Sequence, residues 1–381
     1  LALAGPAAAA AGCLAPQPAS QQPMVIGFYV SWDPASRDSL QRNGPQLTHV
    51  APEWLRLSAD GAGFVDTRTR DDRSLAEPLM REQKLAILPL LNNYLPGSGW
   101  SSAAVHGLVS DAQTRETFAA RLRDYLTEAR WQGVVLDLES VAEEDRGGLV
   151  ELVRALAGAF KPAGLVLGQA VQQASRGFDL KQLAAHADFL VPMVYDEHWA
   201  GDARGAGSIA GIPWTREQLQ RVFAQVAPEK VVVGLGNYAY DWAEGEPQAQ
   251  SIRHADAVER ARQALAESDG SDGAITLDPL ALNATYRYTA ADGTRHTVWL
   301  LDAVSAYNQW TLAWPYRPRG AALWRLGAED PAVWEVIGRA AIGQSAGNGA
   351  TVARLREAAG VRRTLEMDSD SGLIVSGRYE L

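Results

Sequence analysis

The chain has 381 residues, of which 47% are hydrophobic and 21% are charged. This balance is typical of a folded globular protein and excludes a disordered or fibrous chain. The formal net charge of -10 argues against a nucleic-acid or anionic-membrane partner, because both are bound through basic surfaces. The single cysteine, Cys13, excludes an intrachain disulfide framework and a cysteine metal cluster.

The N-terminal segment, residues 1–23, has the composition of an export signal or a linker. Its alanine-rich start, LALAGPAAAAAGC, is shorter than the ~20 residues that span a bilayer, and a Pro/Gln/Ser-rich stretch follows. Three interpretations stay open: the end of a secretory signal, lipidation at Cys13, and an ordinary N-terminal tail. We expect an extracytoplasmic location, either periplasmic, secreted or membrane-anchored.

Eight short apolar runs alternate with amphipathic segments of helical period. The apolar runs are residues 24–32, 47–57, 84–91, 131–140, 164–171, 187–196, 230–240 and 320–327. The clearest helical segments are 111–130, 142–160, 178–186, 214–227 and 251–267. Strands that alternate with helices indicate parallel βαβ units, and a closed (β/α)8 barrel requires eight of them. An open, doubly wound sheet is the alternative.

Two segments depart from this alternation. Residues 270–300 alternate around Asp292-Gly293, which predicts a small β hairpin inserted after the seventh strand. After residue 342, a Gly/Ser/Ala-rich stretch precedes a short amphipathic helix and a second hairpin pattern. We therefore expect an α/β fold with a TIM barrel at 24–342, followed by a C-terminal connector at 343–381.

The fourth apolar run carries two carboxylates at the spacing of a strand. Because side chains alternate along a strand, Val135, Asp137 and Glu139 share one face. In an α/β barrel this face points to the axis, and catalytic groups lie at the C-terminal ends of the strands. Two neighbouring carboxyl groups raise one another's pKa, which keeps one protonated as a general acid. A solvated strand end or an ion pair with an arginine would show the same spacing.

Two other predicted strands end in polar or aromatic residues. Met193 and Tyr195 share a face at the end of the sixth run, so the phenol points to the same mouth as the carboxylates. Asp196 follows directly, and Trp324 in the eighth run offers a flat surface for a sugar ring. An acid, a phenol and an indole on converging strands indicate a site that cleaves carbohydrate.

Further candidates for substrate binding lie in or just after the remaining runs. They are Tyr29 in the first run, Glu53 in the second, Asn92 after the third and Tyr238 in the seventh. The six histidines show no spacing typical of metal ligands, and the glycines do not form a dinucleotide loop. We therefore expect neither a metal nor another cofactor.

The segment WQGVVLDLE (131–139) resembles the signature strand of glycoside hydrolase family 18, the chitinase-like family, whose pattern is D-G-x-D-x-D-x-E. MVYD (193–196) resembles the family's sixth-strand M-x-Y-D, and GFYVSW and LWRLGAEDP resemble its first and eighth strands. The resemblance covers roughly residues 24–340. It is closest to bacterial members fused to polysaccharide deacetylase and glycosyltransferase domains, and more distant to spore-cortex and peptidoglycan-directed members.

The resemblance implies a role for each matching residue. Glu139 would be the general acid that protonates the glycosidic oxygen, and Asp137 would support the substrate's 2-acetamido group. Tyr195 would donate a hydrogen bond to the acetamido carbonyl, Trp324 would stack under the sugar, and Asp196 would support the site. The family is a substrate-assisted exception to the usual two-carboxylate mechanism of retaining glycosidases.

The implied function is hydrolysis of β-linked N-acetylglucosamine polysaccharide: chitin-like polymers, peptidoglycan or an exopolysaccharide. The sequence departs from the signature pattern at two positions, because Gln132 and Val135 stand where the family has its first two acids. Asp137 then lacks its inner acidic partner. The alternatives are a non-catalytic glycan-binding barrel within a larger polysaccharide-processing protein, and a scaffold domain that positions partner domains.

Overall fold

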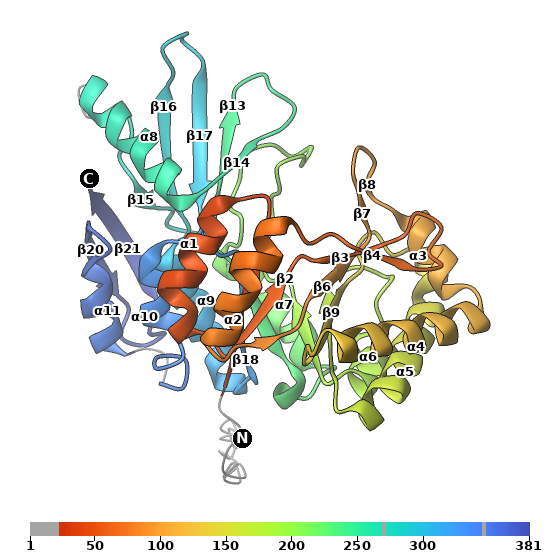
Figure 1. Ribbon diagram of the computed structural model, residues 1–381. Helices are drawn as coiled ribbons and strands as arrows, with labels where there is room; N and C mark the ends of the chain where they lie inside the picture. The colour runs from red at the N-terminus through yellow and green to blue at the C-terminus, as the bar shows by residue number, and fades with distance from the viewer. Residues whose placement is uncertain (1–22, 269–271, 345–347) are drawn as a thin grey trace, which may run out of the picture.

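The computed structural model describes residues 23–268, 272–344 and 348–381. The segment interpreted as a signal, with Cys13, lies outside the described residues except for Pro23. Within these ranges, eight parallel strands form a barrel with helices on its outside (Figure 1). In chain order the barrel strands are β1 (Met24–Tyr29), β2 (His49–Pro52) continued by β3 (Leu55–Leu57), β5 (Ala86–Ile87) continued by β6 (Leu90–Asn92), β9 (Gly133–Asp137), β10 (Val166–Val171), β11 (Phe189–Pro192), β12 (Val232–Gly236) and β18 (Gly320–Trp324).

Parallel pairing runs around the barrel in two arcs. One arc has the order β12-β18-β1-β2-β5 and the other β11-β10-β9-β6-β3. The bridges Leu190↔Val231 and Met193↔Gly234 join β11 to β12. On the opposite side, the second and third barrel strands join the two arcs. Their first parts, β2 and β5, pair in one arc, and their second parts, β3 and β6, pair in the other. The predicted (β/α)8 barrel is confirmed, and the open doubly wound sheet is excluded.

Helices follow most barrel strands, as the helical periods predicted. They are α1 (Pro34–Asn43), α2 (Glu77–Glu82), α3 (Ser102–Val109), α4 (Ala112–Glu128), α5 (Arg146–Phe160), α6 (Leu180–His186), α7 (Ile212–Phe223), α8 (His254–Glu267), α9 (Ala303–Ala313), α10 (Trp334–Ile337) and α11 (Gly349–Arg356). Asp33, Asp111 and Asp179 precede α1, α4 and α6, and each accepts a hydrogen bond from a first-turn backbone N–H. None of the helices in the described part of the chain combines the length and apolar composition needed to cross a bilayer.

Alternation along β9 divides its side chains between two hydrophobic layers. Val134 and Leu136 pack in the large outer layer under the helices. Val135 packs inside the barrel with residues of other strands, among them Phe28 and Val191. Because Val135 faces the interior, Asp137 faces the same way at the end of the strand, as the spacing predicted.

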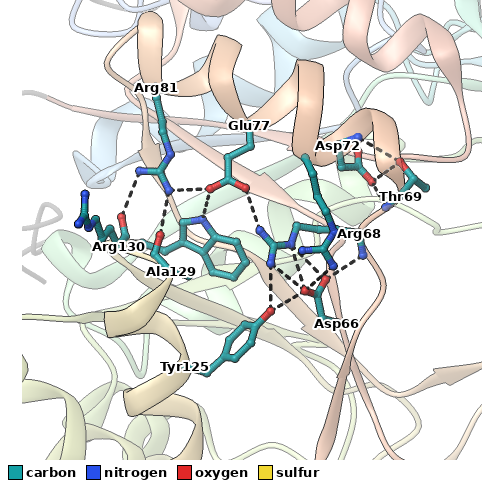
Figure 2. A network of polar contacts seen from close by, with 11 residues as sticks. Asp66, Arg68, Thr69, Asp72, Glu77, Arg81, Tyr125, Ala129 and Arg130 are labelled. Atoms are coloured by element: carbon teal, nitrogen blue, oxygen red, sulfur yellow. Dashed lines mark hydrogen bonds and ion pairs between the residues drawn. The ribbon is translucent and has the colours of Figure 1, made fainter.

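A polar network on the outside of the barrel fixes the start of β9 (Figure 2). Arg68 forms ion pairs with Asp66 at 2.7 Å and with Glu77 at 2.8 Å. Its guanidinium lies 4.6 Å from the ring centroid of Trp131, whose indole N–H donates to Glu77 at 3.0 Å. Trp131 comes just before β9, so the network anchors the strand that carries the two carboxylates.

The insertion after the seventh strand is larger than predicted. The expected hairpin forms from β16 (Ala284–Thr289) and β17 (Arg295–Leu300). It is preceded by β13 (Ala239–Ala243), β14 (Gln250–Ile252), α8 and β15 (Thr276–Leu277). The run 230–240 is therefore not one strand, because β12 lies in the barrel whereas β13 pairs antiparallel with β17. Figure 1 shows β13, β16 and β17 extending away from the barrel beside α8.

The C-terminal residues join this inserted sheet. The predicted second hairpin forms from β20 (Val361–Met367) and β21 (Ile374–Glu380), after the short β19 (Glu357–Ala358). Strand β21 pairs with β15, so the sheet has the order β14-β13-β17-β16-β15-β21-β20-β19. This differs from the expected connector, because the hairpin completes the edge of the inserted sheet and packs against the body of the protein.

Candidate active site

A cavity of about 510 Å³ opens at the C-terminal ends of the barrel strands. This is the end at which α/β barrels carry their active sites. Its lining brings together six residues that the sequence singled out: Asp137, Glu139, Met193, Tyr195, Asp196 and Trp324. They come from β9, β11 and β18 or from the residues that directly follow these strands, so three strands converge on one site as expected.

Glu139 is held at the cavity by contacts to both its backbone and its side chain. The buried Asn93 amide accepts a hydrogen bond from Glu139 N at 2.8 Å and donates one to Glu139 O at 2.9 Å. Gln172 Nε2 donates to Glu139 Oε2 at 3.0 Å. Burial, then the nearby charges of Asp137 and Asp196, raise the pKa of Glu139 well above its ordinary value. The carboxyl group therefore retains its proton near neutral pH.

Asp137 is a buried carboxyl group with an unsatisfied oxygen. Its side chain lines the cavity, yet Oδ1 has no hydrogen-bond partner among the described residues. Val135, the preceding residue on the same face, is fully buried and offers only methyl groups. Burial, then the charge of Glu53, raise the pKa of Asp137. Asp137 therefore lacks an acidic partner at position 135, as the departure from the signature pattern indicated.

Asp196 is held by the hydroxyl groups of two tyrosines, one directly before strand β13 and one within it. Tyr238 and Tyr240 both donate a hydrogen bond to Asp196 Oδ1, Tyr240 at 3.0 Å. Burial raises the pKa of Asp196, although these two hydrogen bonds act in the opposite direction. Tyr240 lines the cavity, whereas Tyr238 does not. Tyr238, expected to bind substrate, therefore contacts the site through Asp196.

Tyr195 lies among the three carboxyl groups. Its ring packs edge-on against Tyr238, with centroids 6.3 Å apart. Burial, then the charges of Asp137, Asp196 and Glu139, raise the pKa of the Tyr195 phenol far above its ordinary value. The phenol is therefore a permanently protonated hydrogen-bond donor at the cavity wall.

Trp324 and Met193 supply the apolar part of the cavity. The Trp324 ring meets Phe28 edge-on, with centroids 5.5 Å apart. The peptide bond that follows Trp324 is cis. The Met193 carbonyl accepts a hydrogen bond from Gln173 Nε2 at 3.1 Å, which ties the ends of β10 and β11 together. An indole floor beside an acid and a phenol can hold a sugar ring with its linkage next to the acid.

Glu53 and Asn92 lie beside the cavity and outside its lining. Asn92 Nδ2 donates to Glu53 Oε1 at 2.8 Å, and the other Glu53 oxygen accepts from Trp32 Nε1 at 2.9 Å. Asn92 is also the register partner of Asp137 in the β6–β9 pair. The two residues thus border Asp137 on the side of the second and third strands.

Tyr29 is not at the site, which corrects the expectation that it binds substrate. Its hydroxyl donates to Asp72 at 3.1 Å, and its ring packs in the outer hydrophobic layer. The reason is strand alternation, because the preceding Phe28 faces the barrel interior and the cavity. Two neighbouring residues of one strand cannot both point inward.

Several lining residues were not predicted from the sequence. Gln172 and Gln173 directly follow β10, where polar residues after a buried strand are a usable signal in a barrel. Trp100 lies in a hairpin of β7 (Tyr94–Leu95) and β8 (Gly99–Trp100), which no periodicity marked. Trp214 comes from α7 and was read only as part of a helix.

Comparison with known proteins agrees with this geometry. The family model "Glycosyl hydrolases family 18" matches residues 24–326. The chain is 26% identical over 318 residues to the putative sporulation-specific glycosylase YdhD of Bacillus subtilis, covering 79% of this chain and 71% of that protein. It is 27% identical over 306 residues to the cortical fragment-lytic enzyme of Bacillus subtilis, covering 77% of this chain and 68% of that protein.

Solved structures share the fold. A chitinase from Chromobacterium violaceum superposes with a TM-score of 0.73 at 26% identity, covering 83% of this chain and 98% of that chain. The Bacillus megaterium spore cortex-lytic enzyme SleL superposes with a TM-score of 0.72 at 20% identity, covering 85% and 75% of the two chains. With the barrel and the acid-lined cavity at its mouth, these matches show that the chain belongs to glycosyl hydrolases family 18 and is a glycosidase.

Proposed function

We propose that the protein hydrolyses β-linked N-acetylglucosamine polysaccharide by a retaining, substrate-assisted mechanism with Glu139 as the general acid. The observation that carries this proposal is the environment of the Glu139 carboxyl group. It lines the cavity, accepts a hydrogen bond from Gln172, and lies close enough to Asp137 and Asp196 for their charges to favour its protonated form. A protonated carboxyl group is what the leaving oxygen of a glycoside needs.

The first step breaks the glycosidic bond. The acetamido oxygen of the bound sugar attacks its own anomeric carbon while Glu139 transfers its proton to the bridging oxygen. The leaving sugar departs as an alcohol, Glu139 becomes a carboxylate, and the remaining sugar carries a positively charged oxazolinium ring. In the second step Glu139 removes a proton from water as the water oxygen attacks the same carbon, and the bond between that carbon and the acetamido oxygen breaks, which restores the neutral acetamido group and protonated Glu139. Two inversions give net retention.

The arrangement of carboxyl groups supports the substrate as the nucleophile. Of the described residues that line the cavity, Asp137 and Asp196 are the carboxylates besides Glu139. A protein nucleophile would lie across the sugar ring from the acid, at about 5–5.5 Å. Asp137 lies on the same strand face as Glu139, two residues earlier, and Asp196 is engaged by two phenols. We therefore assign the role of nucleophile to the acetamido group of the substrate.

The remaining residues of the cavity then have complementary roles. Asp137 stabilises the positive charge of the oxazolinium ring, and the Tyr195 hydroxyl donates to the acetamido oxygen. Trp324 stacks under the sugar ring, and Met193 adds apolar contact beside it. Asp196 supports Tyr195 and Glu139 electrostatically.

Residues beside the cavity contribute to binding of the polymer. Glu53 and Asn92 provide hydrogen-bonding groups for hydroxyls of a neighbouring sugar, since they border Asp137. Tyr238 acts through Asp196 and does not touch the sugar. Candidate polymers are chitin-like chains, peptidoglycan and exopolysaccharide. We propose extracytoplasmic action on such a polymer, and a parent protein with fused deacetylase or glycosyltransferase domains.

The direct test measures release of reducing ends from N-acetylglucosamine oligomers. Replacing Glu139→Gln removes the transferable proton and is expected to lower kcat by about 10²–10⁴-fold. Glu144→Gln is the matched control, because Glu144 is an exposed acid five residues further on. Proton NMR of the first product is expected to show the β-anomer. An α-anomer, or full activity of Glu139→Gln, would overturn the proposed mechanism.

The role of the acetamido group has its own test. An oligomer whose sugar at the cleaved bond is de-N-acetylated loses the nucleophile and the acceptor of the Tyr195 hydroxyl but keeps the contacts of the sugar ring, so it is expected to bind more weakly and not to be cleaved. Cleavage of this oligomer at an unchanged rate would refute substrate assistance.

A non-catalytic glycan-binding barrel is the second candidate function, and the unpartnered Asp137 Oδ1 above Val135 favours it. Binding of oligomers by the wild-type protein without release of reducing ends would establish that alternative. Loss of both binding and cleavage would instead support a scaffold role.

A further inference from the structure

Strand β10 places an amide beside the proposed acid and a methyl group beside Asp137. Strands β9 and β10 pair in parallel without a register shift. Continued past the last paired residues, this register brings Ala170 next to Asp137 and Gln172 next to Glu139. Because side chains alternate along a strand, Ala170 and Gln172 share one face, and both line the catalytic cavity. Of the two carboxyl groups, Glu139 is therefore the one to which β10 presents a hydrogen-bond donor.

The two carboxyl groups of β9 do not hold one another. Within the described ranges, no hydrogen bond joins Asp137 to Glu139, and Asp137 Oδ1 has no partner at all. On the other side of Asp137, its register partner Asn92 directs Nδ2 to Glu53 at 2.8 Å. The Glu139 carboxyl group instead receives its hydrogen bond from Gln172, whose Nε2 lies 3.0 Å from Oε2.

The two oxygens of the Glu139 carboxyl group are not equivalent. Oε2 accepts from Gln172, whereas Oε1 has no hydrogen-bond partner among the described residues and keeps accessible surface. In a neutral carboxyl group one oxygen carries the proton and the other is the better acceptor. The neutral form in which Oε2 accepts therefore carries its proton on Oε1, the oxygen that is open to the cavity.

The surroundings of Glu139 make its charged form costly. Of the described residues, the ionisable side chains that face it are Asp137 on its own strand and Tyr195 and Asp196 after β11. Strand β10 faces it with the neutral amide of Gln172. Burial, then the charges of Asp137 and Asp196, raise the pKa of Glu139. An N–H donor acts in the opposite direction, because it stabilises a carboxylate more than a neutral carboxyl group.

We propose that Gln172 is a positioning residue for the proposed general acid. Its N–H fixes the Glu139 carboxyl group with the proton on Oε1, where the glycosidic oxygen can receive it, and it stabilises the carboxylate that this transfer leaves behind. Gln172 thus supplies the hydrogen bond that Asp137, beside the methyl groups of Val135, does not make. The inference rests on the proposed function and adds to it the residue that sets which oxygen of the acid reacts.

The first test is the variant Gln172→Met, which keeps the length of the side chain and removes the amide. We expect kcat on N-acetylglucosamine oligomers to fall about tenfold with KM changed by less than about threefold, the scale of one charge-assisted hydrogen bond. The alkaline limb of kcat/KM, which reports loss of the Glu139 proton, is expected to move up by about one pH unit. A raised KM with unchanged kcat would make Gln172 a sugar-binding residue and overturn the proposal.

Gln173→Met is the matched control. Gln173 lines the same cavity, but its Nε2 donates to the Met193 carbonyl at 3.1 Å and not to the acid. Its replacement should therefore leave the alkaline limb in place, whatever it does to KM.

A second variant, Gln172→Glu, separates the shape of the side chain from its hydrogen bond. It keeps the outline of glutamine and places a like charge beside Glu139, so it should move the alkaline limb at least as far as Gln172→Met. An alkaline limb at the wild-type position in both Gln172 variants would overturn the proposal.

A titration without substrate separates this inference from the proposed function. In protein with carbon-13-labelled glutamate carboxyl groups, the Glu139 signal is the one missing from Glu139→Gln. Its pKa is expected to be higher in Gln172→Met than in the wild-type protein by about one unit. An equal or lower pKa in the variant contradicts the inference even where glycans are cleaved, since the amide would then not donate to the carboxylate. A higher pKa in a protein that cleaves no glycan supports the role of Gln172 toward Glu139 and refutes the proposed function.

Discussion

Asn93 holds the backbone of Glu139 from both sides through one side-chain amide. Asn93 Oδ1 accepts from Glu139 N at 2.8 Å, and Nδ2 donates to Glu139 O at 2.9 Å and to Ser101 O at 3.0 Å. Ser101 follows the hairpin that carries Trp100, another residue of the cavity lining. The end of the third strand therefore sets the position of the proposed acid relative to the cavity rim.

Asn93→Ala is expected to lower kcat by about 10–100-fold with KM changed by less than about threefold, since a small displacement of a catalytic group is costly. The lost buried hydrogen bonds should also lower the free energy of unfolding by about 2–4 kcal/mol. Steady-state kinetics and urea unfolding measure the two effects.

The matched control for Asn93→Ala is Asn283→Ala. Asn283 is equally buried and bridges the N–H and C=O of Ala210 in the same way, at 2.9 and 3.0 Å. It should lose stability to a similar extent and retain most of kcat. An equal loss of kcat in both variants would show that Asn93 matters only for folding.

The raised pKa of Glu139 predicts a pH-dependent effect of Glu139→Gln on stability. In the unfolded chain this carboxyl group returns to its ordinary pKa of about 4.3. Burial and the charges of Asp137 and Asp196 raise the folded-state pKa, so the folded protein binds a proton that the unfolded chain has released. The contribution of this group is fully present below the ordinary pKa and is lost as pH rises toward the folded-state pKa.

Glutamine does not ionise, so Glu139→Gln is expected to be more stable than wild type at pH 8 and to lose this advantage at pH 4.5. The difference grows by up to about 1.4 kcal/mol per pH unit between the two pKa values. Urea unfolding at pH 4.5, 6 and 8 measures it, with the exposed Glu144→Gln as the variant that shows no such trend. A stability difference that is the same at every pH would contradict the raised pKa.

The barrel and the core of its site could be predicted because both follow from short-range periodicity. The period-two alternation that buries Val135 in the interior also aims Asp137 and Glu139 at the cavity. The same alternation explains why the expectation for Tyr29 was wrong. On β1 it is Phe28 that faces the cavity, so the next residue, Tyr29, points outward and contacts Asp72. Period-two alternation sorts the residues of a strand into two faces. It tells which face points inward only when the direction of one residue is already known.

The inserted sheet could not be predicted because it depends on pairing between distant segments. Strand β13 continues directly from the seventh barrel strand in sequence, and only its pairing with β17 separates the two. Strand β21 joins the same sheet from a hairpin about 100 residues after β15, through the pair Thr276↔Arg378. Local sequence patterns predicted both hairpins, β16–β17 and β20–β21, but they carry no information on the long-range pairing that joins the two hairpins in one sheet.

The two phenols that donate to Asp196 predict a shift in the pH profile. Tyr238→Phe removes one hydrogen bond to the Asp196 carboxylate, so the pKa of Asp196 should rise further. Protonated Asp196 no longer carries the negative charge that favours the protonated form of Glu139. The low-pH limb of kcat/KM is therefore expected to move to higher pH by about 0.5–1 unit.

The control for Tyr238→Phe is Tyr29→Phe. Tyr29 is a buried tyrosine that also donates to a carboxylate, Asp72, but outside the site. Its replacement should change stability without moving the pH profile of kcat/KM. Identical pH profiles for wild type and Tyr238→Phe would remove Tyr238 from the set of positioning residues.

The C-terminal hairpin is tied to the active-site strand β18 through a buried ion pair. Arg363 on β20 pairs with Asp330 at 2.7 Å, and both side chains are fully buried. Asp330 N donates to Asn237 Oδ1 at 2.6 Å, and Asn237 N donates to the carbonyl oxygen of Trp324 at 2.8 Å. The hairpin therefore braces the residue proposed to hold the sugar.

Arg363→Met keeps the length of the side chain and removes the guanidinium from the buried Asp330, which still lies 3.8 Å from His254 and accepts hydrogen bonds from two backbone N–H groups. Breaking a buried pair in this way is expected to lower the free energy of unfolding by about 3–5 kcal/mol. Arg362→Met is the control, because Arg362 is exposed and pairs with Glu380 at 3.5 Å, a contact worth at most about 1 kcal/mol. Adding Asp330→Asn to Arg363→Met should recover part of the loss, since the buried charge is then removed. Equal stability of Arg363→Met and Arg362→Met would mean that the hairpin is not part of the cooperative folding unit.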